Sequence, residues 1–317
     1  MNSSKIKIAA IVGPTASGKT SLSIALAHKF NGEIVSCDSM QIYKRMNIGT
    51  AKPTVEEMDG ITHHLIDFIE PDKQYSCAEY VVDARNAIED ISSRGKLPII
   101  CGGTGLYLDS LLRGGSFEST ETLPEYRAEL EAMAICDGNQ AVHDMLCQVD
   151  PESARAIHPN NLKRVIRALE IYKASGITKS ELDKRSRTGG DTYYRSLIVG
   201  LQYEDRSHLY ERIDKRVDIM LENGLEKETR ELLSEGVFAR SSTAAQAIGY
   251  KELLEYINGN MPYDVAVDHL KRATRRYAKR QMTWFMNHGD VSWINVKRDD
   301  NFEHILNIAS NLFNKFT

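Results

Sequence analysis

The sequence contains little that would indicate a membrane, an extracellular location or a disulfide-stabilised fold. Its five cysteines, at positions 37, 77, 101, 136 and 147, are scattered and form no C-x-x-C pair. This spacing argues against a disulfide framework and a four-ligand zinc site, and it favours a reducing compartment. No apolar run approaches the roughly 20 residues of a membrane span, and the first residues lack the apolar region of a secretory signal. We therefore expect a cytoplasmic protein without membrane contact.

A net positive charge is also absent, which excludes binding to nucleic acid through overall charge. The chain of 317 residues has 40 basic and 44 acidic residues, a net charge of −4. The charges are unevenly spread: two basic and nine acidic residues lie in 113–153, ten basic and four acidic in 154–195, and six basic and none acidic in 271–280. Such tracts are either solvated helix faces or a local basic surface for an anionic partner.

Short apolar runs alternate with amphipathic segments along the chain. Strands that alternate with helices predict parallel pairing through crossover connections, and therefore an α/β fold with a doubly wound parallel sheet. The predicted strands are 6–12, 33–37, 97–101, 196–201 and 292–296. The predicted helices of this part are 20–30, 75–94, 208–223, 225–235, 243–258, 262–287 and 302–316.

The segment between the third and fourth predicted strands contains helical spacing only. Its predicted helices are 124–133, 139–149, 151–157 and 161–175, and it includes the reversal of charge. We interpret residues 113–195 as a helical insertion, and residues 1–112 and 196–317 as the catalytic core on which it is mounted.

The strongest motif follows the first predicted strand. Gly13, Pro14, Thr15, Ala16, Ser17, Gly18, Lys19 and Thr20 match G-x-x-x-x-G-K-[ST] and open a predicted helix. In such a P-loop, backbone N–H groups and the positive end of the helix dipole bind phosphate oxygens. The lysine bridges terminal phosphates and the threonine ligates Mg²⁺. The motif predicts a diphosphate or triphosphate ligand without specifying the reaction.

Two further groups follow the second and third predicted strands. Asp38 stands where ligands bind in open α/β sheets, and it is suited to act as a general base, to bind Mg²⁺ through water, or to cap a helix. Residues 102–107 read GGTGLY. Three glycines at the end of a strand indicate that a ligand approaches the backbone closely.

Eight segments in the same order resemble the tRNA dimethylallyltransferases (tRNA isopentenyltransferases). They are GPTASGKT, DSMQIY, MNIGTAKPT, HHLID, GGTGLY, HPNNLKRVIRALEIY, RIDKRVDIMLENGL and AIGYKELLEY, and they cover nearly the whole chain. The resemblance implies transfer of a dimethylallyl group from dimethylallyl diphosphate to the exocyclic N6 amine of the adenosine immediately 3′ of the tRNA anticodon. It also implies Mg²⁺ as cofactor. Since eukaryotic relatives append a zinc finger whose cysteines are missing here, we expect a bacterial-type enzyme, working as a monomer.

The resemblance also implies roles for individual residues. The P-loop would hold the diphosphate, with Lys19 and Thr20 acting on the leaving group and Thr20 on the metal. Asp38 would accept or orient the amine proton. The target adenosine would lie against Asp38, Ser39, Met40, Gln41 and Thr104. Other tRNA contacts would come from Arg127, from Lys163, Arg164, Val165, Ile166 and Arg167, and from Gln246, Ala247, Ile248, Gly249, Tyr250 and Lys251. The pair Leu162-Lys163 departs from the family's usual proline and glutamine.

Three other activities are compatible with a P-loop α/β core. A relative that prenylates free adenine nucleotides would need neither the large insertion nor the basic tracts. A small-molecule kinase would need a nucleotide base pocket and a lid carrying arginines. A nucleotide-driven RNA-binding switch would not need the carboxylate of Asp38 beside the P-loop.

Overall fold

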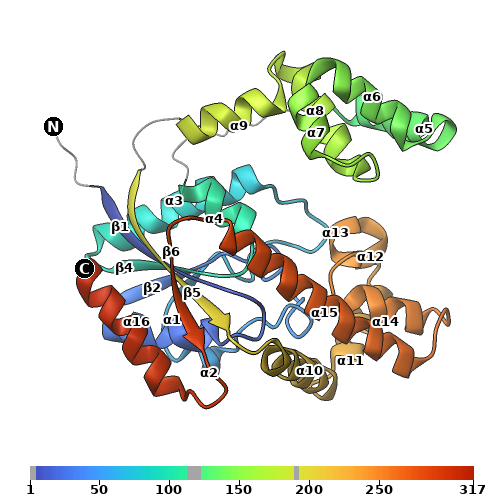
Figure 1. Ribbon diagram of the computed structural model, residues 1–317. Helices are drawn as coiled ribbons and strands as arrows, with labels where there is room; N and C mark the ends of the chain where they lie inside the picture. Colours follow the sequence, from blue (N-terminus) through green and yellow to red (C-terminus); the bar gives the residue numbers. More distant parts are fainter. Residues whose placement is uncertain (1–4, 113–122, 189–192) are drawn as a thin grey trace. The chain divides into compact units, whose positions relative to one another are not determined.

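The centre of the protein is a six-stranded parallel sheet (Figure 1). The computed structural model describes residues 5–112, 123–188 and 193–317. The strand order is β3-β2-β4-β1-β5-β6, and every neighbouring pair is parallel. This confirms the predicted doubly wound α/β fold. The strands are β1 (Ile6–Val12), β2 (Gly32–Ser36), β3 (His63–His64), β4 (Leu97–Cys101), β5 (Tyr194–Tyr203) and β6 (Val291–Val296). The sequence analysis missed β3, which is too short to show a periodicity.

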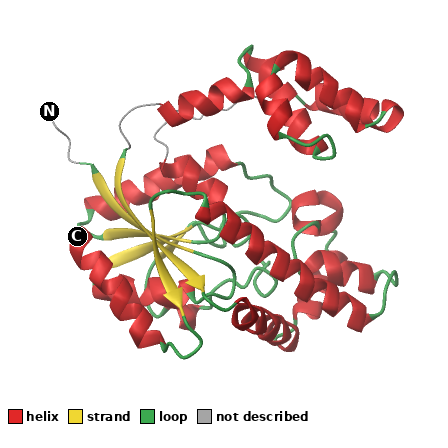
Figure 2. Cartoon of the chain, viewed as in Figure 1, coloured by secondary structure: helices red, strands yellow, loops and turns green. Residues whose placement is uncertain are grey.

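Helices cover both faces of this sheet (Figure 2). Because successive side chains of a strand point to opposite faces, Ala9 and Ile11 of β1 belong to one hydrophobic cluster, and Ile8 and Ala10 belong to another. The helices α1 and α16 pack on the first face, and α3, α4 and the C-terminal part of α15 pack on the second. Their bounds are α1 (Lys19–Lys29), α3 (Cys77–Ser93), α4 (Gly105–Leu112), α15 (Tyr263–Met286) and α16 (Phe302–Phe316).

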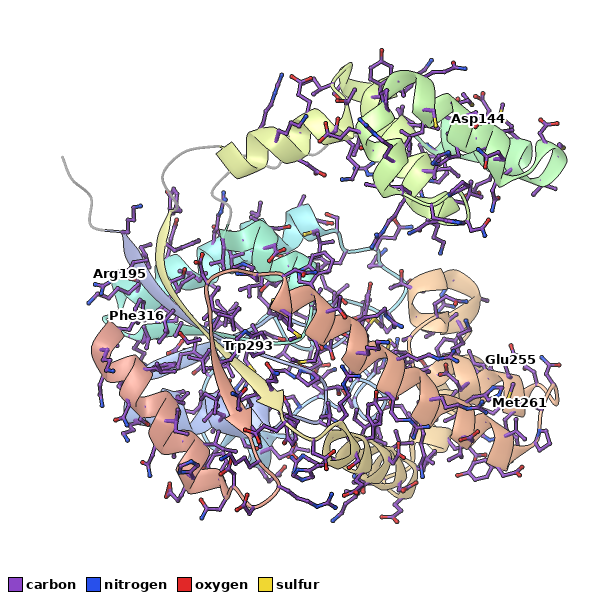
Figure 3. The ribbon with its side chains drawn as sticks, viewed as in Figure 1. Asp144, Arg195, Glu255, Met261, Trp293 and Phe316 are labelled. Atoms are coloured by element: carbon purple, nitrogen blue, oxygen red, sulfur yellow. The ribbon has the colours of Figure 1, made fainter. Side chains whose placement is uncertain are left out.

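Two contacts fix the last elements of the chain to the sheet (Figure 3). A Cβ at Gly200 of β5 would lie 2.5 Å from the ring of Trp293, so the glycine makes room for this indole on the neighbouring strand. The guanidinium of Arg195 lies 5.3 Å from the ring centroid of Phe316, at the end of α16. A cation over an aromatic face is stabilised by the ring quadrupole.

A group of helices beyond the sheet surrounds a third hydrophobic cluster, which includes Leu225, Val237, Tyr250 and Leu270. One predicted helix, 243–258, is divided in two by Gly249, whose φ of 100° is incompatible with a helix. The helix α10 (Arg206–Glu222) packs on the first face of the sheet through Leu209 and Ile213 and reaches the third cluster through Val217. The helices outside the two sheet layers are α2 (Val55–Met58), α11 (Leu225–Ser234), α12 (Val237–Arg240), α13 (Ser242–Ala245) and α14 (Tyr250–Ile257). None of the described helices combines the length and apolar character needed to cross a membrane.

The chain forms two compact units, one of Met1–Leu112 with Tyr193–Thr317 and one of Arg113–Thr192. Tyr194 and Arg195, which the sequence analysis assigned to the insertion, belong to β5. The second unit is helical and has its own core, built on Leu130, Val142, Leu146, Val165 and Leu169. Its helices are α5 (Pro124–Asp137), α6 (Asn139–Val149), α7 (Pro151–Ala156), α8 (Leu162–Ser175) and α9 (Lys179–Thr188).

A buried carboxylate anchors β2, the strand that leads to Asp38. Glu33 is 3% exposed and accepts hydrogen bonds from Arg94 (2.5 and 2.7 Å), Lys96 (2.7 Å) and His64 (2.8 Å). The bonds from Arg94 are the main reason that the pKa of Glu33 is held well below its ordinary value, although burial opposes this. The carboxylate therefore joins β2 to β3 and to the segment that links α3 to β4.

We predict that Glu33→Gln lowers the free energy of unfolding at pH 7 by about 2 kcal/mol, because charge-assisted hydrogen bonds are lost. The folded-state pKa is depressed, so the stabilisation is present above the ordinary pKa of a glutamate and disappears as the pH falls through the folded-state value. Urea unfolding between pH 7 and pH 3 should show the difference between the two proteins shrinking below about pH 4.5. A constant difference across this range would contradict the assignment.

Candidate active site

The P-loop has the backbone geometry of an anion-binding turn. A Cβ at Gly13 would lie 2.8 Å from the carbonyl oxygen of Leu201, and φ is 143° there, so only glycine fits. Gly18 caps α1 with a φ of 90°, which turns the chain into the helix directly after the loop. This geometry directs backbone N–H groups and the N-terminus of α1 toward the same point.

The polar side chains of this loop are suited to a phosphate ligand. Lys19 Nζ donates to the carbonyl oxygen of Pro14 at 2.7 Å. Burial lowers the pKa of Lys19 to about 8, and neighbouring Arg216 acts in the same direction. The buried hydroxyl of Ser17 has no hydrogen-bond partner among the described residues. An anion in the loop would give this hydroxyl an acceptor and would stabilise the charged form of Lys19.

Asp38 follows β2 and closes a turn rather than capping a helix. Its Oδ1 accepts hydrogen bonds from the backbone N–H groups of Met40 (2.9 Å) and Gln41 (3.3 Å). Neither bond uses Oδ2. The negative charge of Asp38 acts to raise the pKa of Lys19 in the P-loop and of Tyr277 in α15, so the carboxylate lies near both.

Thr104 ties the Asp38 turn to the end of β4. Its Oγ1 accepts from the backbone N–H of Ser39 at 3.0 Å, and its own N–H donates to the carbonyl oxygen of Cys37 at 3.0 Å. The ends of β1, β2 and β4 thus bring together the P-loop, Asp38 and Thr104, as the sequence analysis expected for the carboxyl edge of a parallel sheet.

The three glycines of the GGTGLY segment have a different explanation from the predicted one. A Cβ at Gly102 would collide with the carbonyl oxygen of Cys37, at Gly103 with Gln281 Nε2, and at Gly105 with the ring of Trp284. Protein groups approach the backbone closely here, which is enough to explain the three glycines. A ligand at this segment stays a prediction.

Gln281 was missed by the sequence analysis, although it connects the two loops. Its Oε1 accepts from the backbone N–H of Thr15 at 2.8 Å, and its Nε2 donates to the carbonyl oxygen of Gly103 at 3.1 Å. The side chain is 5% exposed. Sequence analysis of single motifs cannot find such a residue, because its partners lie more than 170 positions away.

Two arginines of α10 were also missed. Arg212 Nε donates to the carbonyl oxygen of Ala16 at 3.0 Å, which places it at the P-loop. Arg216 donates to the carbonyl oxygen of Ala51 at 3.5 Å, and its charge contributes to the lowered pKa of Lys19. Their spacing of four residues in a predicted helix places them on one face. This spacing was the signal in the sequence that could have identified the two arginines. Their charges make the surroundings of the P-loop more positive.

Half of the cations in the basic tract 271–280 are paired with acidic groups of the protein. Arg275 forms an ion pair with Asp214 (2.6 Å) and Lys271 with Asp218 (2.5 Å), both on α10, and Arg272 pairs with Asp268 on its own helix. Two of its six cations therefore link α15 to α10 and a third is paired within α15, so the tract as a whole is not the free phosphate-binding surface that its composition suggested.

The predicted tRNA-contacting residues of the helical unit divide into two groups. Lys163 and Arg164 are exposed, whereas Val165 and Ile166 are buried in the core of the unit. Arg127 holds the fully buried Glu170 through two hydrogen bonds, of 3.0 and 2.5 Å, and Arg167 approaches the same carboxylate at 3.5 Å. Burial opposes the ionisation of Glu170, yet the bonds from Arg127 keep its pKa below the ordinary value. Arg127 and Arg167 thus have structural partners.

The segment 246–251 also contains both accessible and buried residues. Gln246 and Lys251 are accessible and Ile248 is partly exposed. Ala247 and Tyr250 lie in the third hydrophobic cluster, and Gly249 is the residue at which the helix is interrupted. Only Gln246, Ile248 and Lys251 of this segment therefore have side chains that a partner molecule could reach.

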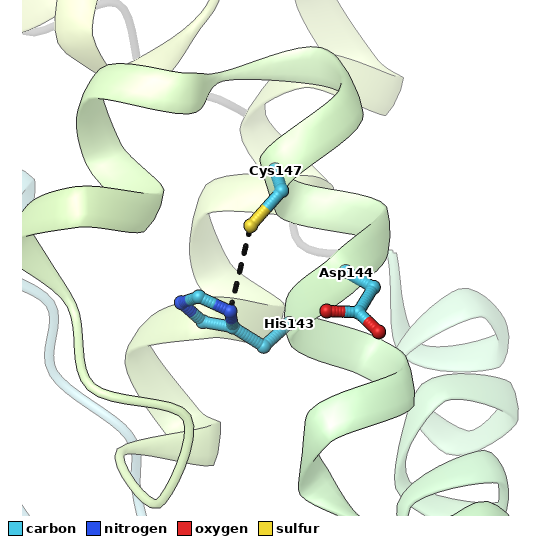
Figure 4. A group of neighbouring side chains, drawn as sticks. All are labelled: His143, Asp144 and Cys147. Atoms are coloured by element: carbon cyan, nitrogen blue, oxygen red, sulfur yellow. Dashed lines mark hydrogen bonds between the residues drawn. The ribbon is translucent and has the colours of Figure 1, made fainter.

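One group of possible metal ligands lies on α6, in the described part of the chain (Figure 4). It consists of His143, Asp144 and Cys147. His143 Nε2 lies 3.1 Å from the carbonyl oxygen of Ala154 and 2.9 Å from that of Ile157, and Cys147 Sγ lies 3.6 Å from its Nδ1. These hydrogen bonds tie α6 to α7 and to the residue after it, which accounts for the buried imidazole as a structural group.

Known proteins resemble this chain along most of its length. Residues 41–288 match the family model described as IPP transferase. A tRNA dimethylallyltransferase of Staphylococcus aureus is 51% identical over 299 residues, which cover 93% of this chain and 94% of that protein. One of Bacillus licheniformis is 50% identical over 303 residues, covering 96% and 95%.

Solved structures of related enzymes resemble this chain over 98% of its length. A full-length tRNA isopentenylpyrophosphate transferase of Bacillus halodurans superposes with a TM-score of 0.72 at 44% identity, covering 98% of each chain. A eukaryotic dimethylallyltransferase acting on tRNA has a TM-score of 0.82 at 32% identity, covering 98% of this chain and 79% of that one.

The fold, the P-loop and these matches define a prenyltransferase of tRNA modification. The chain belongs to the tRNA dimethylallyltransferase family, as the sequence motifs implied. Its reaction is the transfer of a dimethylallyl group to N6 of the adenosine 3′ of the anticodon. This decides among the four activities that the sequence left open.

The contact between Gly103 and Gln281 can be tested directly. We predict that Gly103→Ala lowers kcat/KM by about 10-fold or more, because the new methyl group displaces Gln281 and releases the P-loop from the end of β4. Steady-state kinetics would measure this, with Gly289→Ala as control, since a Cβ at Gly289 meets nothing within 4 Å. Equal activity of both variants would show that the Gln281 bridge is dispensable.

Proposed function

We propose that the P-loop binds the diphosphate of dimethylallyl diphosphate and stabilises it as the leaving group. The proposal rests on the convergent backbone of residues 13–18, the unpartnered hydroxyl of Ser17 and the cations of Lys19, Arg212 and Arg216. Negative charge builds on the diphosphate as the allylic carbon–oxygen bond breaks, and fixed cations and N–H groups stabilise this charge without reorganising.

A Mg²⁺ ion fits the residues at this position. The hydroxyl of Thr20, in the first turn of α1, and the carboxylate of Asp38 near Lys19 are oxygen donors, which Mg²⁺ prefers. When bound, the ion would neutralise part of the charge of the diphosphate. We assign Thr20 as its direct protein ligand. We also propose that the enzyme works as a monomer in the cytoplasm, which agrees with its five free cysteines.

We assign Asp38 as the general base. The amine of adenine is a poor nucleophile because its lone pair is delocalised into the ring. As the carbon–nitrogen bond forms, Oδ2 of Asp38 accepts a proton from the amine, while Oδ1 stays bonded to the backbone of Met40 and Gln41. In this proposal the adenine ring lies against Ser39, Met40, Gln41 and Thr104. Thr104 is included because its hydroxyl is bonded to Ser39 in the same turn.

Asp38→Asn tests this assignment. The amide oxygen of asparagine accepts the same two backbone hydrogen bonds, so the turn persists, but the amide cannot take up a proton. We predict that kcat falls by roughly 10²- to 10⁴-fold while the Kd for tRNA changes little. Transfer of label from dimethylallyl diphosphate to tRNA would measure kcat, and filter binding would measure Kd.

The same assay carries two controls. Labelled dimethylallyl diphosphate is supplied with Mg²⁺ and with tRNA, AMP or ATP in separate reactions, and ATP hydrolysis is followed. Label should appear in tRNA alone and ATP should remain intact. Near-normal turnover by the asparagine variant would remove Asp38 as the base, whereas label in AMP or stoichiometric loss of ATP would contradict the proposed assignment of the substrates.

We propose that the helical unit helps to hold the anticodon stem-loop. The target base is stacked in a loop and must be extruded to reach the amine, which costs a few kcal/mol that other contacts supply. Exposed Lys163 and Arg164 are the cations of the predicted segment that remain free of the Glu170 network. Gln246 and Lys251 are accessible on the catalytic unit and complete the proposed contacts.

Arg164→Gln should raise the Kd for tRNA and reduce the slope of log Kd against log salt by roughly one unit, because one phosphate contact is lost. The Kd for dimethylallyl diphosphate should not change. Lys315→Gln, which removes an exposed cation from α16, is the matched control. Identical salt slopes for both variants would show that Arg164 does not contact a phosphate.

A further inference from the structure

Another buried carboxylate, that of Glu228 in α11, has an unusual number of partners. Its two oxygens accept hydrogen bonds from three consecutive backbone N–H groups, those of Asn47 (3.0 Å), Ile48 (2.9 and 3.1 Å) and Gly49 (3.0 Å). The hydroxyl of Tyr250 donates to Oε1 at 2.6 Å. Glu228 is 9% exposed. One side chain thus satisfies four donors that come from two other parts of the sequence.

These donors require an anion of the size of a carboxylate. Consecutive N–H groups that point to one place form a nest with a fixed positive potential. A glutamine has one acceptor oxygen, and its amide hydrogens would face the N–H groups instead. The packing is equally specific, because a Cβ at Gly49 would collide with the ring of Tyr250. The loop of residues 46–52 therefore fits against Glu228 and Tyr250 in one position.

The loop of residues 46–52 fixes the position of the Gln41 side chain. Gln41 Nε2 donates to the carbonyl oxygens of Thr50 (3.2 Å) and Ala51 (3.0 Å). Two carbonyl acceptors identify this atom as the amide nitrogen, so both of its hydrogens are used and the orientation of the amide is fixed. Ala51 has a positive φ of 49°, which a non-glycine residue adopts only when its surroundings hold it.

We propose that Glu228 is a positioning residue for recognition of the target adenosine. Its carboxylate fixes the loop of residues 46–52, the loop holds the amide nitrogen of Gln41, and Oε1 of Gln41 is thereby left to accept a hydrogen bond from the N6 amine. The inference rests on the proposed contact between Gln41 and the adenosine. Glu228 itself touches neither substrate; it acts through two carbonyl groups of the loop.

A double-mutant cycle separates this role from general stabilisation. Glu228→Gln should lower kcat/KM for tRNA by about 10- to 100-fold, as expected for lost hydrogen bonds to a charged group, and should change KM for dimethylallyl diphosphate by less than about threefold. In a Gln41→Ala background, the same substitution should have almost no further effect on kcat/KM, since the group that it positions is gone. The matched control is Glu226→Gln, on the same helix, whose carboxylate pairs with exposed Arg230.

Tyr250→Phe removes one of the four hydrogen-bond donors to Glu228 and replaces Glu228→Gln in the cycle if that variant does not fold. It should lower kcat/KM by about 3- to 10-fold, again only when Gln41 is present. If Gln41→Ala alone leaves kcat/KM unchanged, the proposed contact with the adenosine is wrong and the role of Glu228 is wrong with it. If Gln41→Ala lowers kcat/KM, but the effects of Glu228→Gln or Tyr250→Phe persist in its background, the contact stands and the positioning role is overturned.

Discussion

A single buried amide, the side chain of Gln281, joins the two loops on which the site is built. It accepts from the P-loop at Thr15 and donates to the loop after β4 at Gly103. Because α15 is packed on α10 through the ion pairs of Arg275 and Lys271, this amide also connects the P-loop to the helix that provides Arg212 and Arg216. The phosphate-binding loop is consequently fixed from both sides before any ligand arrives, which reduces the reorganisation required during the reaction.

The parts of the structure that depend on local sequence were predictable. The strands β1, β2, β4, β5 and β6 and the P-loop follow from apolar runs and from a motif whose spacing is short. The division of the predicted helix 243–258 at Gly249 was not predicted, because a glycine in a helical pattern is often tolerated. The partners of Gly102, Gly103 and Gly105 were not predictable, since they come from distant segments and only the folded chain brings them together.

Charge was the least reliable guide. The tracts in 154–195 and 271–280 looked like free cationic surfaces, yet Arg167, Lys271, Arg272 and Arg275 all approach acidic groups of this chain, as Arg127 does. A formal count cannot distinguish a cation that neutralises a buried carboxylate such as Glu170 from one that faces solvent. Exposure and pairing together leave Lys163 and Arg164 as the free cations of the segment 163–167, because both are exposed and their neighbour Arg167 is turned toward Glu170.

The lowered pKa of Lys19 has a consequence for the energetics of ligand binding. With a pKa of about 8, a substantial fraction of the free enzyme at mildly alkaline pH carries this amine without its proton. A multiply charged anion beside it raises the pKa again, so binding draws a proton from the solvent. The heat measured on binding therefore includes the ionisation enthalpy of the buffer, and calorimetry in two buffers of different ionisation enthalpy would count the protons taken up at the P-loop.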